Sequence, residues 1–403
     1  MTKRFWITAL IVAVLVAITL SATIVSAIAK NVAAQPRTVE ESALATPDNR
    51  GDKMINERIY ATTHNRSRWL YDLITVSGKA TLTDSNDAKK IFEAARNCDV
   101  ISDYTEEDMV LPLTRFFVAQ TTVRALNYKQ RNPGRIADIN SLQSAMATMA
   151  YYGYFLPDIN MMVYPDREIT AEEYEGLLTQ LERYRQLKGK VILAFGDSIM
   201  HGSGNNDEGI ADMIAEKYGM TAHDYSVPGA AMGLWVGRSH IIDQLRLALN
   251  DLIKPDIILI NGGTNDMNHV PLGDFTEGYD MTNTSSENFT GGFEKTMWML
   301  TNNYYRVPVV YVRAHNMDLG SDANERMFGE RALDVVEKWN GTSVDIYKDT
   351  DLYTEDSYMR GRYTYFDPAF GNAPDSIHPN ALGYATYYLP LVTDEIMNQL
   401  IKE

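Results

Sequence analysis

The sequence predicts an α/β fold with a parallel sheet in the C-terminal half of a 403-residue chain. Two observations carry this prediction. Short apolar runs typical of buried strands recur along this half, and they alternate with longer stretches of helical periodicity. Such alternation is the signature of a parallel sheet covered by helices on both faces, in which functional sites form at the carboxyl ends of the strands.

The alternation begins at Lys190, where the composition changes sharply. The runs predicted as strands are 191–195, 222–227, 257–260, 307–312 and 344–347, of which the second and fifth are the weakest. The stretches predicted as helices are 209–218, 240–253, 293–304, 323–339 and 381–401. We therefore assign residues 188–403 to one α/β domain.

The preceding residues, 55–187, have a mostly helical pattern. Apolar positions recur at spacings of three and four through 59–73, 88–95 and 109–126. Thr170 followed by Glu173 forms a capping box, which predicts the start of the last helix in this region. The role of the region stays open: it packs on the α/β domain, forms an interface with a partner, or spaces the domain from a membrane.

The amino terminus carries a targeting signal. Lys3 and Arg4 precede an uncharged stretch, Phe5 to Ala29, that is long enough to cross a bilayer as a helix. We expect residues 1–29 to be a signal anchor or a signal peptide, with the anchor favoured, and residues 30–54 to be a polar linker. The rest of the chain is then held outside the cell membrane by a single span, or secreted if the leader is cleaved.

Composition excludes several classes of function. The chain has 37 basic and 53 acidic residues, a formal net charge of -16, which argues against nucleic acid and anionic membrane surfaces as partners. Cys98 is the single cysteine, so no intrachain disulfide can form, and we expect a buried, unreactive thiol. No histidine cluster has the spacing of metal ligands, and we predict neither a metal nor another cofactor.

Two short segments contain the residue types of a nucleophilic site. Ser198 follows the first predicted strand within Gly196-Asp197-Ser198, where a turn would expose its hydroxyl. Asp375 stands three residues before His378, a spacing that lets a carboxylate orient an imidazole acting as base towards a serine. Taken singly, each segment also fits an ordinary turn or helix cap.

Two further loops could supply hydrogen-bond donors to a developing oxyanion. Gly229, in the segment Ser226 to Ala230, could present its backbone N–H without a side chain in the way. Asn265, in Gly262-Gly263-Thr264-Asn265-Asp266, could donate from its amide. Alone, each loop is equally compatible with a glycine turn.

Together and in this order, the four segments resemble the SGNH hydrolases, also called GDSL-type esterases and lipases, over Val191 to the carboxyl terminus. The resemblance implies a three-layer α/β/α sandwich of the SGNH, flavodoxin-like kind. It also implies a catalytic triad of Ser198, Asp375 and His378, with oxyanion donors from Ser198, Gly229 and Asn265. Ile199 stands where the motif that names the family has leucine, a change of similar volume.

Two long polar connections, 267–292 and 348–374, are expected to shape specificity. The second is rich in tyrosine, which suits a sugar surface, although the rings could equally pack the loop on itself. We expect an esterase that removes acetyl or another short acyl group from a carbohydrate or related ester.

Alternatives are a lipid or lysophospholipid esterase, a sugar O-acyltransferase, and a noncatalytic envelope protein for binding or assembly. His201 and His269 are expected either to line the pocket or to be ordinary loop residues. The acyl substrate, its acceptor, any protein partner of residues 55–187 and the oligomeric state stay open.

Overall fold

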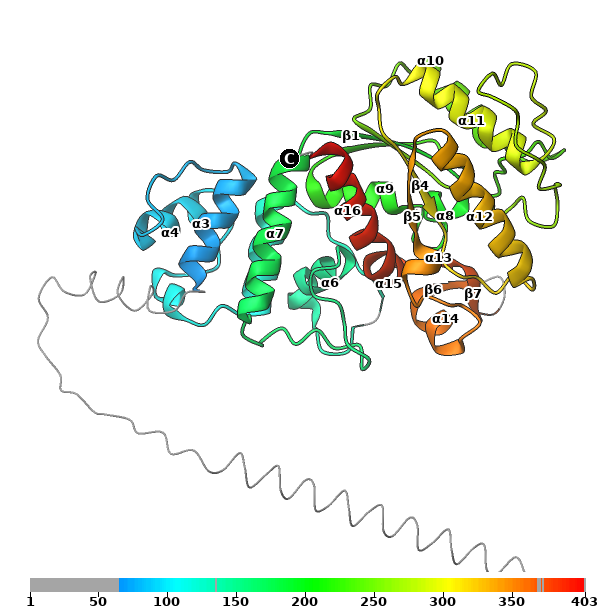
Figure 1. Cartoon of the computed structure of the whole chain (residues 1–403). Helices are drawn as coiled ribbons and strands as arrows, with labels where there is room; N and C mark the ends of the chain where they lie inside the picture. Colours follow the sequence, from blue (N-terminus) through cyan, green and yellow to red (C-terminus); the bar gives the residue numbers. More distant parts are fainter. Residues whose placement is uncertain (1–64, 135, 368–370, 372, 402–403) are drawn as a thin grey trace, which may run out of the picture. The chain divides into compact units, whose positions relative to one another are not determined.

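A computed structural model describes residues 65–134, 136–367, 371 and 373–401 of the chain (Figure 1). The described residues belong to a compact unit that runs from Asp52 to Glu403. The predicted signal anchor or signal peptide and the predicted linker lie outside them. Within the described ranges, no helix combines the length and the apolar character that a membrane crossing requires.

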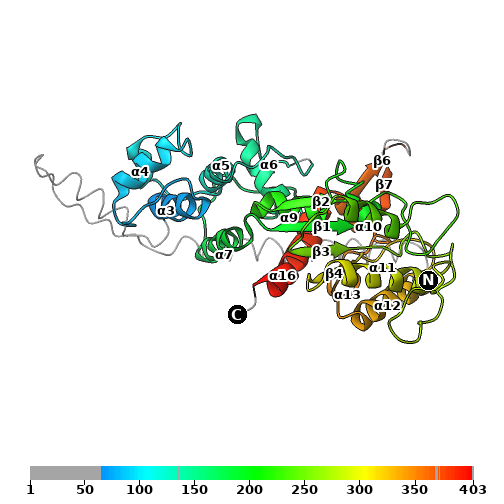
Figure 2. The ribbon, with the colours of Figure 1, turned by 90° about the horizontal axis from the view of Figure 1, so that it is seen from above.

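The predicted parallel sheet is present. It consists of β1 (Val191–Phe195), β2 (Thr221–Asp224), β3 (Ile257–Ile260), β4 (Val309–Arg313) and β5 (Thr342–Asp345). The strands lie in the order β2-β1-β3-β4-β5, and every neighbouring pair is parallel. Figure 2 shows β2, β1, β3 and β4 side by side in this order. Strand β2 ends earlier than predicted because the Asp224 carboxylate accepts a hydrogen bond from the backbone N–H of Ser226, which turns the chain.

Helices cover both faces of this sheet. Side chains of β1 alternate between the faces, with Ile192 and Ala194 in one core and Leu193 and Phe195 in the other. The first core is closed by α9 (Ile210–Tyr218) and α16 (Leu389–Leu400). The second is closed by α10 (Ile241–Asn250), α11 (Phe289–Asn303) and α12 (Asp322–Lys338). The α/β part is therefore a three-layer sandwich.

The helical region contains α3 (Arg66–Ser77), α4 (Ala88–Asn97), α5 (Arg115–Leu126), α6 (Ser144–Tyr151) and α7 (Ala171–Leu187), with 3-10 turns at Glu106–Val110 and Ser141–Gln143. The capping box predicted for α7 is confirmed, since Thr170 and Glu173 each bond the backbone N–H of the other. Helix α7 packs against α3 and also against α9 of the sandwich. Of the three roles left open by the sequence, packing on the α/β part is thus observed.

The chain after β5 departs from the sequence-based expectation. The connection over 348–374 contains the end of α13 (Ile346–Asp349), the helix α14 (Ser357–Tyr363) and the strand β6 (Thr364–Asp367). Strand β6 pairs antiparallel with β7 (Ala373–Pro379), so His378 lies on a strand rather than in a loop.

The helix expected over 381–401 is divided. It consists of α15 (Ala381–Gly383), a π-turn at Tyr384–Tyr388 and then α16. Pro390 explains the division, because it has no N–H to donate to the carbonyl four residues earlier. The chain widens by one residue instead, and the Leu389 N–H bonds to the Tyr384 carbonyl.

Candidate active site

Ser198 is the first residue of the short helix α8 (Ser198–His201), three residues beyond the end of β1. Asp197 caps this helix by accepting a hydrogen bond from the Ile199 N–H at 2.9 Å. A side chain at Gly196 would come within 2.5 Å of the Asn261 oxygen, so only glycine allows this tight turn. Ser198 is buried, with 8% of the residue exposed.

The structure brings Ser198 and His378 together across 180 residues of sequence. The Oγ of Ser198 lies 2.9 Å from Nε2 of His378, and Nδ1 of the same ring lies 2.7 Å from Oδ2 of Asp375. The three side chains form one continuous chain of hydrogen bonds. When Nδ1 carries the ring proton and donates it to Asp375, Nε2 is free to accept the serine proton.

Electrostatics keep Asp375 in its charged form. Partial burial by itself would raise the pKa of this carboxyl, but the hydrogen bond and charge of His378 and the bonds from backbone N–H groups outweigh it. The net effect lowers the pKa of Asp375 below its ordinary value. The other oxygen of Asp375 accepts the N–H of His378 at 3.1 Å, which fixes the orientation of the pair.

Gly229 and Asn265 come from different loops and lie close together. Nδ2 of Asn265 donates to the carbonyl of Ala230, the residue after Gly229, at 3.0 Å. This amide has a second N–H that the bond leaves available. Gly229 adopts φ +80°, a conformation that favours glycine. Its loop is tied to the nucleophile turn, since the Val227 N–H donates to the Gly196 carbonyl at 3.0 Å.

Asp266 is a side chain of the candidate site that the sequence reasoning missed. It is fully buried, and its two oxygens accept the N–H groups of Met232 and Gly233 at 3.0 and 2.7 Å. Burial raises the pKa of Asp266 to about 6, although these two bonds partly oppose the shift. Asp266 therefore holds the loop of Gly229 against the loop of Asn265. Its position directly after Asn265 is the signal that could have pointed to it.

Gln244 and Asn261 support the nucleophile turn and were also missed. Gln244 bonds both the N–H and the carbonyl of Gly196, at 3.0 and 2.8 Å, and the Asn261 oxygen accepts the Asp197 N–H at 3.2 Å. Both are buried, Gln244 on α10 and Asn261 directly after β3. Nothing in the sequence around them marks them as part of the site.

His201 and His269, the other histidines named from sequence, have partners outside the triad. His201 lies 3.4 Å from Asp207, and His269 stacks on Trp235 with ring centres 4.0 Å apart. His315 is fully buried and bonds the Tyr388 hydroxyl at 2.7 Å, and burial lowers its pKa to about 3. Cys98 is only half-buried, and its Sγ bonds the Lys79 carbonyl. The described residues hold no cluster of potential metal ligands.

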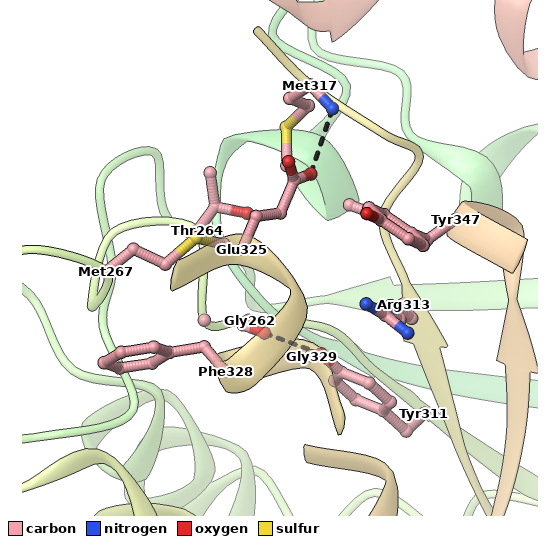
Figure 3. A pocket seen from close by; sticks show the side chains of 12 residues that line it. Gly262, Thr264, Met267, Tyr311, Arg313, Met317, Glu325, Phe328, Gly329 and Tyr347 are labelled. Atoms are coloured by element: carbon pink, nitrogen blue, oxygen red, sulfur yellow. Dashed lines mark hydrogen bonds between the residues drawn. The ribbon is translucent and has the colours of Figure 1, made fainter. Parts of the chain in front are cut away.

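A small cavity lies beside the loop of Asn265 (Figure 3). Its volume is about 20 Å³, room for one water molecule and too little for a long acyl chain. Arg313 borders it, bonded to Asp345 at 3.1 Å, as does Glu325, which accepts the Met317 N–H at 2.9 Å. Burial raises the pKa of Glu325 to about 7. We interpret the residues around this cavity as support for the loop, and we do not assign the cavity as a substrate pocket.

A parallel sandwich with a serine, a histidine and an aspartate joined at the carboxyl edge of its sheet is typical of serine hydrolases. Residues 194–386 match the model of the GDSL-like Lipase/Acylhydrolase family, which confirms the resemblance seen in the sequence. This part of the chain is a GDSL-type hydrolase domain. No curated protein matches the chain.

Several solved structures are similar to about half of the chain. A lipase/acylhydrolase from Enterococcus faecalis is 18% identical, with 53% of this chain and 98% of that chain covered and a TM-score of 0.36. A protein from Lactobacillus plantarum is 16% identical, with 53% and 97% covered and a TM-score of 0.41. A family two carbohydrate esterase from Clostridium thermocellum, in complex with cellohexaose, is 17% identical, with 53% and 65% covered and a TM-score of 0.38.

Proposed function

We propose that this protein is a serine esterase that removes acetyl or another short acyl group from a carbohydrate or related ester. The observation that carries the proposal is the unbroken hydrogen-bonded chain from the Ser198 Oγ through His378 to Asp375. This geometry suits proton transfer from the hydroxyl to Nε2 as the oxygen attacks an ester carbonyl.

The reaction proceeds in two halves. Attack by Ser198 forms a tetrahedral intermediate, whose negative oxygen accepts hydrogen bonds from the N–H groups of Ser198 and Gly229 and from the Asn265 amide. Collapse breaks the bond to the alcohol, which leaves with the proton held by His378. Water, deprotonated by the same imidazole, then attacks the Ser198 ester and releases the free acid.

One feature supports a sugar as the alcohol part of the ester. A groove of about 820 Å³ runs beside the residues that follow β7, and it is lined in part by Tyr358 and Phe366, which are 50% and 46% exposed. Exposed aromatic faces next to polar groups, here Arg362 and Asn160, suit sugar rings.

We also propose that the enzyme works outside the cytoplasm, tethered or secreted. The support is the sequence of residues 1–29, with Lys3 and Arg4 ahead of an uncharged stretch of membrane-spanning length. The net negative charge of the chain agrees with a substrate that is not nucleic acid.

Hydrolysis of p-nitrophenyl esters of increasing acyl length tests the proposal. We expect acetate to be the best substrate, and Ser198→Ala and His378→Ala each to lower kcat by more than about a thousandfold while the protein stays folded. Preference for long acyl chains would favour a lipid esterase. Transfer of the acetyl group to an added sugar in preference to water would favour an O-acyltransferase, and no turnover by folded protein would refute the esterase.

A further inference from the structure

The loop between β2 and α10 carries an arginine, Arg238, in an ordered position. Backbone bonds close this loop on itself: the Ala231 N–H donates to the Ser239 carbonyl and the Arg238 N–H to the Trp235 carbonyl, at 3.0 and 3.1 Å. Nε2 of His240 accepts the Trp235 N–H at 3.0 Å. The backbone of Arg238 is therefore fixed although its side chain is exposed.

The guanidinium of Arg238 lies close to Gly229. A Cβ atom on Gly229 would lie 3.0 Å from Nη1 of Arg238. The space that a side chain at this position would occupy is thus bordered by a cation. Because Gly229 is a candidate oxyanion donor, Arg238 stands beside the place where an ester would react.

Trp235 holds the guanidinium in place. The Arg238 Cζ lies 4.7 Å from the centre of a Trp235 ring, and the His269 ring stacks on Trp235 at 4.0 Å with an interplanar angle of 14°. Trp235 therefore contacts both the imidazole and the guanidinium. Its contact with the guanidinium restricts the arginine, which lowers the entropy lost when the arginine binds a ligand.

Within the described part of the chain, no carboxylate forms an ion pair with Arg238. Asp243, the acid on the adjacent helix α10, is instead paired with Arg246 at 2.6 Å and with His240 at 3.4 Å. The charge and the planar fork of N–H donors on Arg238 are available to a ligand. In a chain of net charge -16, such an arginine beside the reacting groups points to an anion.

We propose that Arg238 forms a subsite for a carboxylate or phosphate group on the alcohol part of the ester. The inference rests on the proposed function, because a short acyl group such as acetyl has no charge and the anion must then belong to the acceptor. An acidic sugar is a class of acceptor that carries both an acylated hydroxyl and an anionic group. The guanidinium binds its anionic group through two parallel N–H bonds while the acetyl carbonyl lies at Ser198 and Gly229.

Matched acetyl sugars test this subsite. The neutral substrate is an O-acetylated methyl glucoside, and its partners are the glucuronoside, with a carboxylate at C6, and the 6-phosphate, each acetylated at the same position. Acetate release gives kcat/KM for each with the full-length protein. We expect an anionic substrate to be preferred by about tenfold at low salt, and the preference to fall as salt is added.

Substitutions then assign the preference to Arg238. Arg238→Gln should bring the anionic-to-neutral ratio of kcat/KM close to one, and Arg238→Lys should keep part of it, because the charge stays and the bidentate fork is lost. Arg246→Gln, on the adjacent helix, is the matched control and should keep the wild-type ratio. Whichever of the two anionic substrates shows the larger ratio identifies the group that the subsite binds.

Three results would overturn the inference. A wild-type ratio near one, or a ratio that Arg238→Gln leaves unchanged, refutes the subsite while acetyl ester hydrolysis stands. An equal loss of kcat with neutral and anionic substrates would make Arg238 a stabiliser of the oxyanion itself. If folded wild-type protein releases acetate from none of these sugars nor from p-nitrophenyl acetate, the proposed function fails and the subsite fails with it.

Discussion

The helical region and the α/β sandwich differ in what sequence patterns indicate about them. The family model begins at residue 194, so all of α3 to α7 lies outside it. Yet the two regions share one hydrophobic core, in which Trp69 of α3 and Leu181 of α7 belong with Ile192 of β1 and Ile214 of α9. Motifs identify the residues that react, whereas the packing that supports them is spread over the chain and leaves no short pattern.

Contacts from the helical region reach the neighbourhood of the triad. The Tyr151 hydroxyl donates to Glu208 at 2.8 Å and accepts from Asn205 at 3.1 Å, both in the loop after α8. Arg131 pairs with Glu208 at 2.7 Å. In the same loop, a Cβ at Gly204 would lie 3.0 Å from the Cβ of His378. A segment with no family match thus braces the loop that packs on the proposed base.

Trp69→Ala should have the largest effect on stability of the substitutions considered. Trp69 is fully buried, and its Nε1 donates to Thr121 at 3.0 Å, so the truncation leaves a large cavity and costs about 3–5 kcal/mol. Urea unfolding followed by circular dichroism and by esterase activity checks it. Both signals should shift together, because the core is shared. If activity survives unfolding of the helices, the two regions are independent. Leu247→Ala, at an exposed site, is the control.

Asn265→Ala should lower activity strongly and change stability little, the opposite of Trp69→Ala. If Asn265 is an oxyanion donor as proposed, its removal lowers kcat by about a hundred- to a thousandfold. The urea midpoint should move little because a single partly buried bond is lost. Steady-state kinetics beside urea unfolding checks both values. Asn302→Ala, which removes an exposed amide from α11, should change neither. A full kcat in Asn265→Ala would remove Asn265 from the oxyanion site.

The pH dependence of stability tests the role of Lys217 at the interface between the helical region and the sandwich. Its ammonium is buried beside the rings of Tyr154 and Tyr218, at 4.5 and 5.1 Å, and its carbonyl accepts the Tyr128 hydroxyl. Burial lowers the pKa of Lys217 to about 7, and Arg183 adds to this shift while Asp394 opposes it. Between that pH and its ordinary pKa, the folded form is neutral while the unfolded form binds a proton.

Stability should therefore rise with pH above 7, by at most about 1.4 kcal/mol per unit. Lys217→Met should be more stable at pH 7 and should lack this rise, which urea titrations at pH 7, 8 and 9 will measure. Lys254→Met, at an exposed site, should keep the wild-type slope. Parallel pH dependence in Lys217→Met and wild type would show that Lys217 is not the group responsible.

Tyr151→Phe should have the smallest effect of these substitutions. It tests directly whether Tyr151 supports the loop after α8. It deletes only the hydroxyl between Glu208 and Asn205 and costs roughly 1 kcal/mol, or up to about fivefold in kcat. Initial rates with p-nitrophenyl acetate, compared with Tyr305→Phe at an exposed site, measure the change. Lower stability with unchanged kcat would limit Tyr151 to a structural role.

Sequence reasoning located an element best where a run of apolar residues has a clear end. Strands β1 and β3 were located to the residue, because four or five buried apolar residues end at glycine or asparagine. The hairpin of β6 and β7 was missed because Pro374 and Pro379 argue against a strand, although an edge strand tolerates them. The links made by Asp266 and Gln244 could not be predicted, since they join residues brought together only by the fold.

The separation of Ser198 from His378 also sets the order in which the protein becomes reactive. At about 5–20 residues per second of synthesis, the chain takes roughly 9–36 s to extend the 180 positions from Ser198 to His378. During that interval the serine has no base, and β3 and β4 have no α16 to cover them. A growing chain therefore lacks the proposed base until its C-terminal part is made, and α16, which packs against β3 and β4, follows in the same short stretch.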